Sequence, residues 1–198
     1  MSSKLSRGLL IVALVALCAY PAAAATVRQM NLEQMVDNAG RIFRGTLLDV
    51  REGTVQAGGG ELPTTIYVFR VDEALKGTFQ NVKGEQIAEI QMVGSKIDAK
   101  QVGTMRRLPI LPDHPKLEKG RDYLLLTTAP SAVGLSTTVG LGQGAFTLIG
   151  KGGSAVAVNE NHNAGLFAGM NNGFAATPQE GPVAYSTLAT LIRDIVGE

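Results

Sequence analysis

Cysteine, histidine and tryptophan are the scarcest residues in this chain of 198 residues. There is one cysteine, there are two histidines and no tryptophan, and aromatic residues make up only 5%. One cysteine excludes a disulfide within the chain, so a hydrophobic core has to stabilise the fold, and a chain of this length can form one. Zinc sites use clustered thiols and imidazoles, whereas His114 and His162 lie far apart in the sequence. We therefore expect no metal site and no cofactor, and we interpret both histidines as exposed loop residues.

Charged residues are also few, at 18% of the chain, and the 18 basic residues nearly balance the 17 acidic ones, for a net charge of +1. This balance excludes a strongly basic nucleic-acid-binding protein and a strongly acidic solvating tail. Proteins that bind single-stranded nucleic acid also need aromatic side chains on which bases stack, and this chain has few of them. We expect no nucleic-acid partner.

Only one long apolar run is present, at the N-terminus. Lys4 and Arg7 precede the apolar residues 9–19, and four alanines follow at 22–25. A basic start, an apolar centre and small residues at the end are typical of a secretory signal peptide. The run is shorter than the roughly 20 residues that span a membrane. The sequence therefore predicts a cleaved signal peptide at 1–25.

Removal of this signal would change the composition of the chain. Cleavage removes Cys18, which is the only thiol, and leaves 16 basic residues against 17 acidic ones. We expect no integral membrane segment in the remaining chain. The remaining chain has no cysteine and no Asn-x-Ser/Thr glycosylation site. Both features favour an exported bacterial protein over a eukaryotic secreted one. We expect the protein in the periplasm or outside the cell.

Beyond the signal, the pattern of apolar residues changes from helical to strand-like. Asn31 and Gln34 have the spacing of a capping box, and apolar residues three and four apart follow, which predicts a helix over 32–39. Alternating or continuous apolar residues predict strands at 41–50, 65–73, 86–93, 123–128, 137–141, 145–150 and 154–158, with loops at 53–63 and 94–121.

The C-terminal part of the chain has a different composition. Residues 159–182 are rich in Asn, Gly and Ala and are predicted to be irregular. An amphipathic helix follows, with Ser186 as its cap and an apolar face made of Tyr185, Leu188, Leu191, Ile192 and Ile195. The sequence thus predicts a mainly β protein with a small closed β-barrel at 26–158 and a short N-terminal helix. The segment at 159–198 would pack its C-terminal helix on the barrel.

Three stretches of the chain carry a family resemblance: IFRGT at 42–46, YVFRVDEALKG at 67–77 and GRDYLLL at 120–126. Together they resemble a group of uncharacterised exported bacterial proteins. The barrel of that group is of the oligonucleotide/oligosaccharide-binding (OB) type and is similar to netrin-like domains and tissue inhibitors of metalloproteinases. The resemblance implies an OB-like barrel and, because some members occur beside matrixin-type metalloproteases, an association with extracellular proteases. Those inhibitors chelate zinc through an N-terminal cysteine, which the predicted mature chain lacks, so their mechanism is not implied here.

No catalytic motif stands out. The metalloprotease and esterase signatures His-Glu-x-x-His and Gly-x-Ser-x-Gly are absent. Residues 140–145 fit a dinucleotide-binding glycine pattern, but strand-like residues follow where a helix would be needed, so a glycine-rich turn is the better interpretation. The sequence therefore favours an exported, non-enzymatic binding or protein-interaction module. Two alternatives stay open: an exported hydrolase with unidentified site residues, and a structural component of the cell envelope.

Two regions contain candidate partner contacts. Arg106 and Arg107 begin a proline-containing stretch within a basic loop, which would attract an anionic partner. The Asn/Gly/Ala-rich segment contains four large apolar side chains, Leu166, Phe167, Met170 and Phe174. These four either fold back onto the barrel or are exposed as the contact face for another exported protein or for a second copy of this chain.

Overall fold

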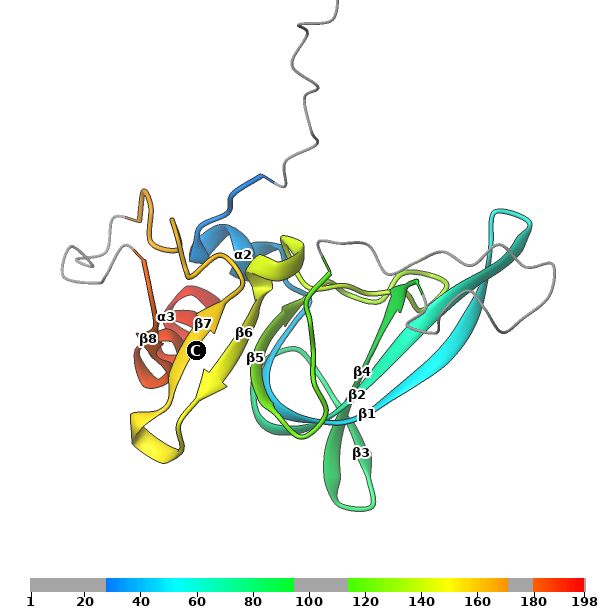
Figure 1. The fold of residues 1–198 in the computed structure, drawn as a ribbon, viewed down its shortest axis with the longest axis horizontal. Coiled ribbons are helices and arrows are strands. Elements are labelled where there is room, and N and C mark those ends of the chain that lie inside the picture. The colour runs from blue at the N-terminus through cyan, green and yellow to red at the C-terminus, as the bar shows by residue number, and fades with distance from the viewer. Residues whose placement is uncertain (1–27, 95–113, 171–179, 198) are drawn as a thin grey trace, which may run out of the picture.

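The computed structural model describes residues 28–94, 114–170 and 180–197, and this part of the chain is mainly β. Within these residues, one antiparallel sheet of eight strands is accompanied by two α-helices, α2 and α3 (Figure 1). The elements, in chain order, are α2 (Leu32–Asn38), β1 (Arg41–Ala57), β2 (Gly60–Lys76), β3 (Gln80–Val82), β4 (Glu85–Val93), β5 (Asp122–Thr127), the 3-10 turn η1 (Leu141–Gly144), β6 (Ala145–Ile149), the 3-10 turn η2 (Gly152–Ser154), β7 (Val156–Asn159), β8 (Val183–Ala184) and α3 (Tyr185–Val196).

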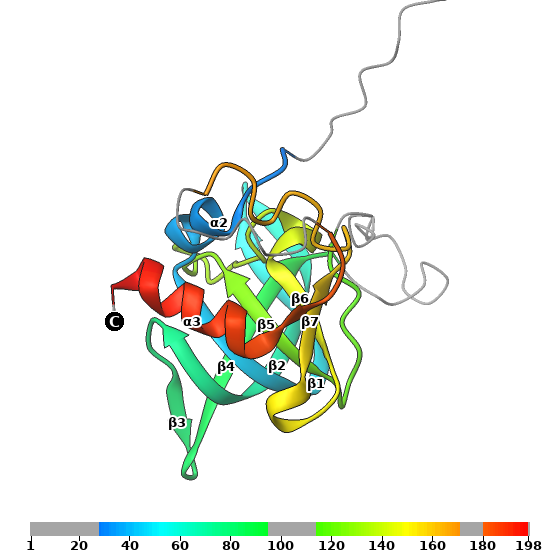
Figure 2. The same ribbon diagram turned by 90° about the vertical axis from the view of Figure 1, so that its left-hand side faces the viewer.

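The sheet is strongly curved but is not closed, so the predicted closed barrel is not confirmed. Its strand order is β3-β4-β2-β1-β5-β6-β7-β8, and the two outer strands, β3 and β8, do not pair with each other. In Figure 2, β3 projects away from β6 and β7. Two isolated bridges nevertheless link Gln91 of β4 to Leu135, and Thr127 of β5 to Thr138. The segment 135–138 therefore lies between the edges of β4 and β5.

The strand predicted at 137–141 is reduced to that bridge. Gly140 has a left-handed φ of 62°, and the chain then coils into η1 instead of continuing as a strand.

Gly45 lies within strand β1, at a position where the register between β1 and β2 shifts. A Cβ atom there would lie 2.3 Å from the carbonyl oxygen of Arg70, so only glycine fits this bulge.

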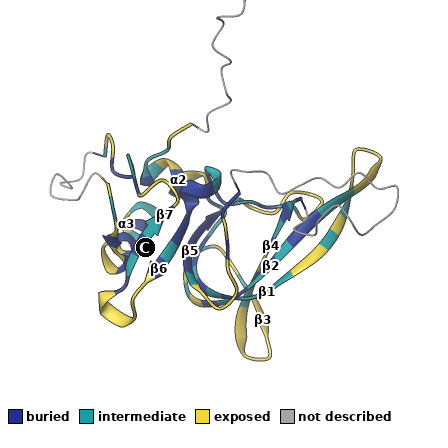
Figure 3. Ribbon diagram, viewed as in Figure 1, coloured by how far each residue is buried: buried dark blue, intermediate teal, exposed yellow. Residues whose placement is uncertain are grey.

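The predicted loop at 53–63 is wrong, because most of it belongs to strands. β1 and β2 form one long hairpin, and only Gly58 and Gly59 lie outside the ladder. Their φ values of 61° and 80° suit a two-residue turn that matches the twist of the strands. The outer part of the hairpin is largely exposed, as Figure 3 shows, so its residues lack the apolar alternation that marks a half-buried strand.

Two hydrophobic clusters hold the fold together. The first lies where the helices meet the sheet and includes Leu32 and Leu188. The second fills the concave side of the curved sheet and is built around Phe43, Phe69 and Tyr123, whose rings meet edge to face at centroid distances of 5.6 and 6.2 Å. The strand predicted at 65–73 is confirmed as part of β2, and its alternate residues Tyr67, Phe69 and Val71 are all buried.

Both helices predicted from the sequence are present. The capping box of α2 is confirmed: Gln34 N donates to Asn31 Oδ1 at 2.9 Å, and Asn31 N donates to Gln34 Oε1 at 3.2 Å. The cap predicted for α3 is wrong, because β8 runs directly into the helix and the N-cap is Ala184, without a side-chain hydrogen bond. Within the described residues, no helix has the length and apolar character that a membrane span requires.

Glu73 of β2 connects the sheet to α3 through a hydrogen bond and an ion pair. Its carboxylate accepts a hydrogen bond of 2.6 Å from the Tyr185 hydroxyl and forms an ion pair with Arg193. The guanidinium of Arg44 lies over the Tyr185 ring, 5.1 Å from the centroid. Burial, and then the hydrogen bond to Glu73, raise the pKa of Tyr185. Glu73 thus contacts both the first residue of α3 and Arg193 in its last turn.

Tyr185→Phe is expected to lower the free energy of unfolding by about 1–3 kcal/mol at neutral pH, because a buried hydrogen bond to a charged group is lost. Its pH dependence has a defined sign. The folded-state pKa is raised, so the stabilisation is complete below the unfolded tyrosine pKa of about 10 and is lost as the pH rises beyond it. Urea unfolding between neutral and alkaline pH measures both effects. A loss under about 0.5 kcal/mol with an unchanged alkaline slope would contradict this role.

Candidate functional site

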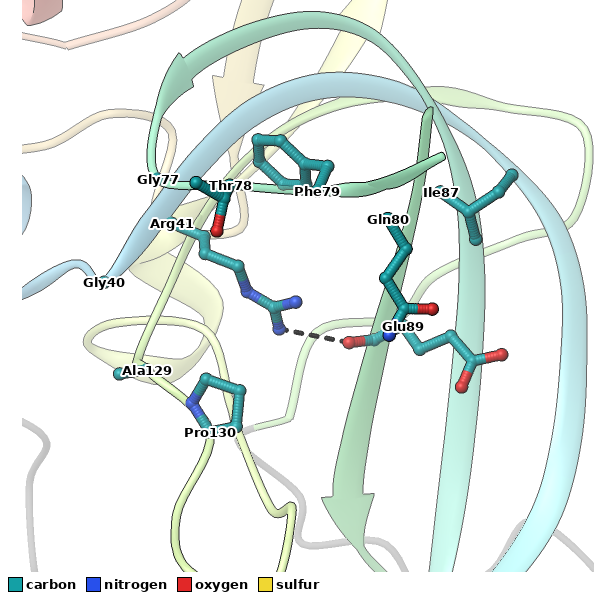
Figure 4. Close-up of a pocket in the computed structure, with 10 residues that line it drawn as sticks. All are labelled: Gly40, Arg41, Gly77, Thr78, Phe79, Gln80, Ile87, Glu89, Ala129 and Pro130. Atoms are coloured by element: carbon teal, nitrogen blue, oxygen red, sulfur yellow. Dashed lines mark hydrogen bonds between the residues drawn. The ribbon is translucent and has the colours of Figure 1, made fainter. Parts of the chain in front are cut away.

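A pocket of about 580 Å³ opens beside the edge of β4 (Figure 4). It lies between the start of β1, the segment that leads into β3, and the chain that follows β5. Its size is typical of small-ligand sites. The residues that line it are Gly40, Arg41, Gly77, Thr78, Phe79, Gln80, Ile87, Glu89, Ala129 and Pro130.

The pocket exists because part of the β4 edge has no neighbouring strand. β3 pairs with β4 only over residues 85–87, and the bridge from Leu135 reaches β4 at Gln91. Between these points, the backbone oxygen of Glu89 accepts a hydrogen bond from the Arg41 side chain. A side chain thus takes the place that a strand would fill, and open space remains around it.

Two glycines, Gly40 and Gly77, allow three segments of the chain to approach one another closely at one side of the pocket. A Cβ atom on Gly40 would lie 2.5 Å from the nitrogen of Ala129. Gly77 has a φ of 84°, and a Cβ atom there would lie 2.7 Å from the oxygen of Gly40. Side chains at these positions would push the three segments apart. The Lys76-Gly77 corner and the Gly40-Arg41 pair therefore set the shape of the pocket.

Arg41 is the principal polar group of the pocket. Its Nη2 atom donates to the Glu89 oxygen at 3.0 Å and more weakly to Ser136 Oγ at 3.5 Å. Its Nε atom is buried and has no hydrogen-bond partner. Burial lowers the pKa of Arg41, since the charged form loses contact with water.

The charge of Arg41 is not balanced by a carboxylate in the part of the chain that the structure describes. Glu89 contributes the carboxylate that lines the pocket, but it pairs with Arg51. Figure 4 shows the guanidinium lying across the pocket toward the Glu89 backbone, while the Glu89 carboxylate points away from it. The pocket therefore presents an uncompensated cation.

The remaining lining is mixed in character. Figure 4 shows Thr78 and Pro130 on either side of the Arg41 side chain. Phe79 packs edge to face on Phe43 at a centroid distance of 5.2 Å, which fixes its ring. Ile87 adds aliphatic surface. Such a wall suits a ligand that joins a polar group to an apolar body.

Three of the candidate contact residues named from the sequence lie away from this pocket, in or against the first hydrophobic cluster. Leu166 and Phe167 are buried, with 1% and 5% of their surfaces exposed, in the first hydrophobic cluster, and Met170 packs partly buried against it. The oxygen of Leu166 also accepts a hydrogen bond of 2.8 Å from Leu32 N. These side chains have folded back and do not form an open contact face. The other three candidates, Arg106, Arg107 and Phe174, lie outside the described residues.

The histidines and the glycine-rich turn show no catalytic arrangement. His114 is buried, with 7% of its surface exposed, which corrects its interpretation as an exposed residue, since the segment from His114 to Leu117 packs inward. His162 is exposed. Residues 140–145 form η1 and lead into β6, so no α-helix follows the glycines. Among the described residues, no group of three or more His, Cys, Asp or Glu side chains could hold a metal.

Comparisons with protein-family models, with curated proteins and with solved structures found no match. Function is therefore inferred from the pocket itself. The sequence pointed to none of its lining residues as a site, because Arg41, Glu89 and Ala129 lie on three separate segments. The only local signals were glycines beside a basic residue, at Gly40-Arg41 and Lys76-Gly77.

Proposed function

We propose that the protein is an exported, non-enzymatic binding module and that the pocket lined by Arg41 is its ligand site. One observation carries this proposal: the Arg41 guanidinium lines a pocket of about 580 Å³, and among the described residues it has no carboxylate partner and its Nη1 has no hydrogen-bond acceptor. A charged group in a partly buried place loses free energy when its hydrogen bonds are incomplete. Such groups persist at binding sites, where a ligand completes their hydrogen bonds.

The scaffold in this proposal is an OB-like barrel. Strands β1, β2, β4 and β5 would form its wall together with the segment 135–138, and the two isolated bridges at Gln91 and Thr127 support this arrangement. The pocket would then occupy the gap in the wall between β4 and the start of β1. A wall of paired strands would hold the site rigidly, which favours binding without rearrangement.

The setting of the proposal is the periplasm or the outside of the cell, because the first 25 residues have the pattern of a signal peptide. The partner would be another exported protein, a small molecule or a second copy of this chain. An association with extracellular proteases is supported only by the resemblance of the three stretches at 42–46, 67–77 and 120–126.

Backbone amide NMR with a library of neutral, anionic and cationic fragments tests the site. Bound fragments are expected to shift the amide signals of Thr78, Phe79 and Ala129. Thr78→Tyr places a larger side chain at the pocket wall and should abolish these shifts. Thr54→Tyr is the matched control, because it adds the same bulk on the exposed hairpin, away from the pocket, and should leave the shifts intact. Shifts that map elsewhere, or that survive Thr78→Tyr, would refute the site.

The two alternative functions give different outcomes in simple assays. A hydrolase would convert a bound fragment, and new product signals would appear in the same spectra. An envelope component would sediment with membranes after removal of its signal, whereas a binding module would stay in the soluble exported fraction.

A further inference from the structure

The hydrogen bonds of Arg41 show what its ligand must supply. A guanidinium has five N–H donors, and the structure accounts for those of Nη2 through Glu89 and Ser136. Nε has no partner, and within the described ranges no hydrogen bond from Nη1 is found. Nε and Nη1 lie on different edges of the guanidinium and cannot donate in parallel, and Nε is buried, so Nη1 is the group left to donate to a charged acceptor in the pocket.

The surrounding charges restrict the ligand further. Arg41 is the one cationic side chain among the residues that line the pocket, and the Glu89 carboxylate lies at its wall. Glu89 is paired with Arg51, so Arg41 gives the pocket one net positive charge, which the two charges of a phosphate dianion would exceed. A carboxylate carries one negative charge and can accept a charge-assisted hydrogen bond from Nη1. The charge of the pocket and the free Nη1 group therefore favour a carboxylate.

The apolar wall indicates what is attached to that carboxylate. Phe79, Ile87 and Pro130 give the pocket an aromatic and aliphatic side, and the Phe79 ring is held by its contact with Phe43. A pocket of this volume also exceeds the size of a bare inorganic anion or acetate. The ligand would therefore be an organic acid with an apolar body.

We infer that the pocket binds the carboxylate of an organic acid through Arg41, with the apolar body of the acid against Phe79. This inference rests on the proposed function, because it names the ligand of the same site. The acid can be a free small molecule or the C-terminus of a peptide, which presents the same group. The alternative is a purely structural Arg41 that only covers the edge of β4 at Glu89.

The test is a titration of the full mature protein, followed by amide NMR, with two matched pairs of probes. The first pair is N-acetyl-phenylalanine and its uncharged amide, and the second is N-acetyl-Gly-Gly-Phe and its amide. The acids are expected to shift the Thr78 and Phe79 signals and to bind at least roughly tenfold more tightly than the amides, since a hydrogen-bonded charge is lost in each amide. Tighter binding of N-acetyl-phenylalanine would identify a small acid as the source, and tighter binding of the longer acid a peptide end.

Three variants complete the test. Arg41→Gln is expected to remove the preference for the acids, and Arg41→Lys, which keeps the charge without the planar fork, should retain only part of it. Lys151→Gln removes the same charge from an exposed loop and should keep the full preference. If Arg41→Gln does not fold, the comparison of acid and amide binding to the wild-type protein still tests whether the pocket prefers a carboxylate.

The outcomes separate this inference from the proposed function. Equal affinity of acid and amide for the pocket overturns the carboxylate inference, while the ligand site stands. Failure of every acid to shift the pocket signals at about 10 mM also overturns it, because affinities of that order are too weak for a specific charge pair. The proposed site itself falls if the shifts caused by the fragment library map elsewhere or survive Thr78→Tyr.

Discussion

Phe167→Asp is expected to unfold the protein. Phe167 is buried in the first hydrophobic cluster, beside Leu166. Loss of a buried phenylalanine ring costs about 3–5 kcal/mol, and burial of an unpaired carboxylate adds several more. That sum is comparable to the roughly 5–15 kcal/mol that stabilises a typical domain. Circular dichroism with thermal melting at neutral pH measures the effect.

The neighbouring residue provides a matched control. Ala168 is exposed, so Ala168→Asp introduces the same charge one position later in the chain and should melt near the wild-type temperature. A folded Phe167→Asp variant with a wild-type melting temperature would contradict the burial of this side chain and return it to the candidate contact residues.

Phe69→Ala is expected to lower the free energy of unfolding by about 3–5 kcal/mol. The ring of Phe69 is fully buried on the concave side of the sheet and packs against the rings of Phe43 and Tyr123. Its removal would leave a cavity that the surrounding strands cannot close. Urea unfolding followed by tyrosine fluorescence gives the change.

Val82→Ala is the control for this prediction, because Val82 is 46% exposed on the outer strand β3. It should change the stability by about 0.5 kcal/mol or less. A loss below about 1 kcal/mol for Phe69→Ala would mean that β2 does not direct this face toward a core.

Local patterns in the sequence predicted those helices and strands whose signals lie among residues close together in the chain. The capping box at Asn31 and the apolar spacing in residues 32–39 identified α2, and the alternation of Tyr67, Phe69 and Val71 identified the buried face of β2. These signals were sufficient because burial on one face leaves a period in the sequence. Where one strand is exposed on both faces, as in the outer hairpin, no such period exists, and the strands were missed.

The candidate site depends on contacts that no local pattern records. Arg41 meets Glu89 across 48 positions of sequence, and Ala129 approaches Gly40 from a third segment. The sequence drew attention instead to apolar residues in a charge-poor region. The structure gives a simpler reason for that composition, because Leu166 and Phe167 lie in the core together with the apolar face of α3.

The Arg41 guanidinium itself offers the most direct test of the proposed ligand site. Its Nη protons can be followed by NMR in the free protein and during titration with the fragments that bind the protein. In the free protein, the Nη1 protons should exchange rapidly with water, because they have no acceptor among the described residues. The proposed site predicts that the guanidinium signals shift and exchange more slowly with water as a fragment binds, because the ligand covers this group in the pocket. Guanidinium signals that stay unchanged while every bound fragment shifts amide signals elsewhere would contradict it.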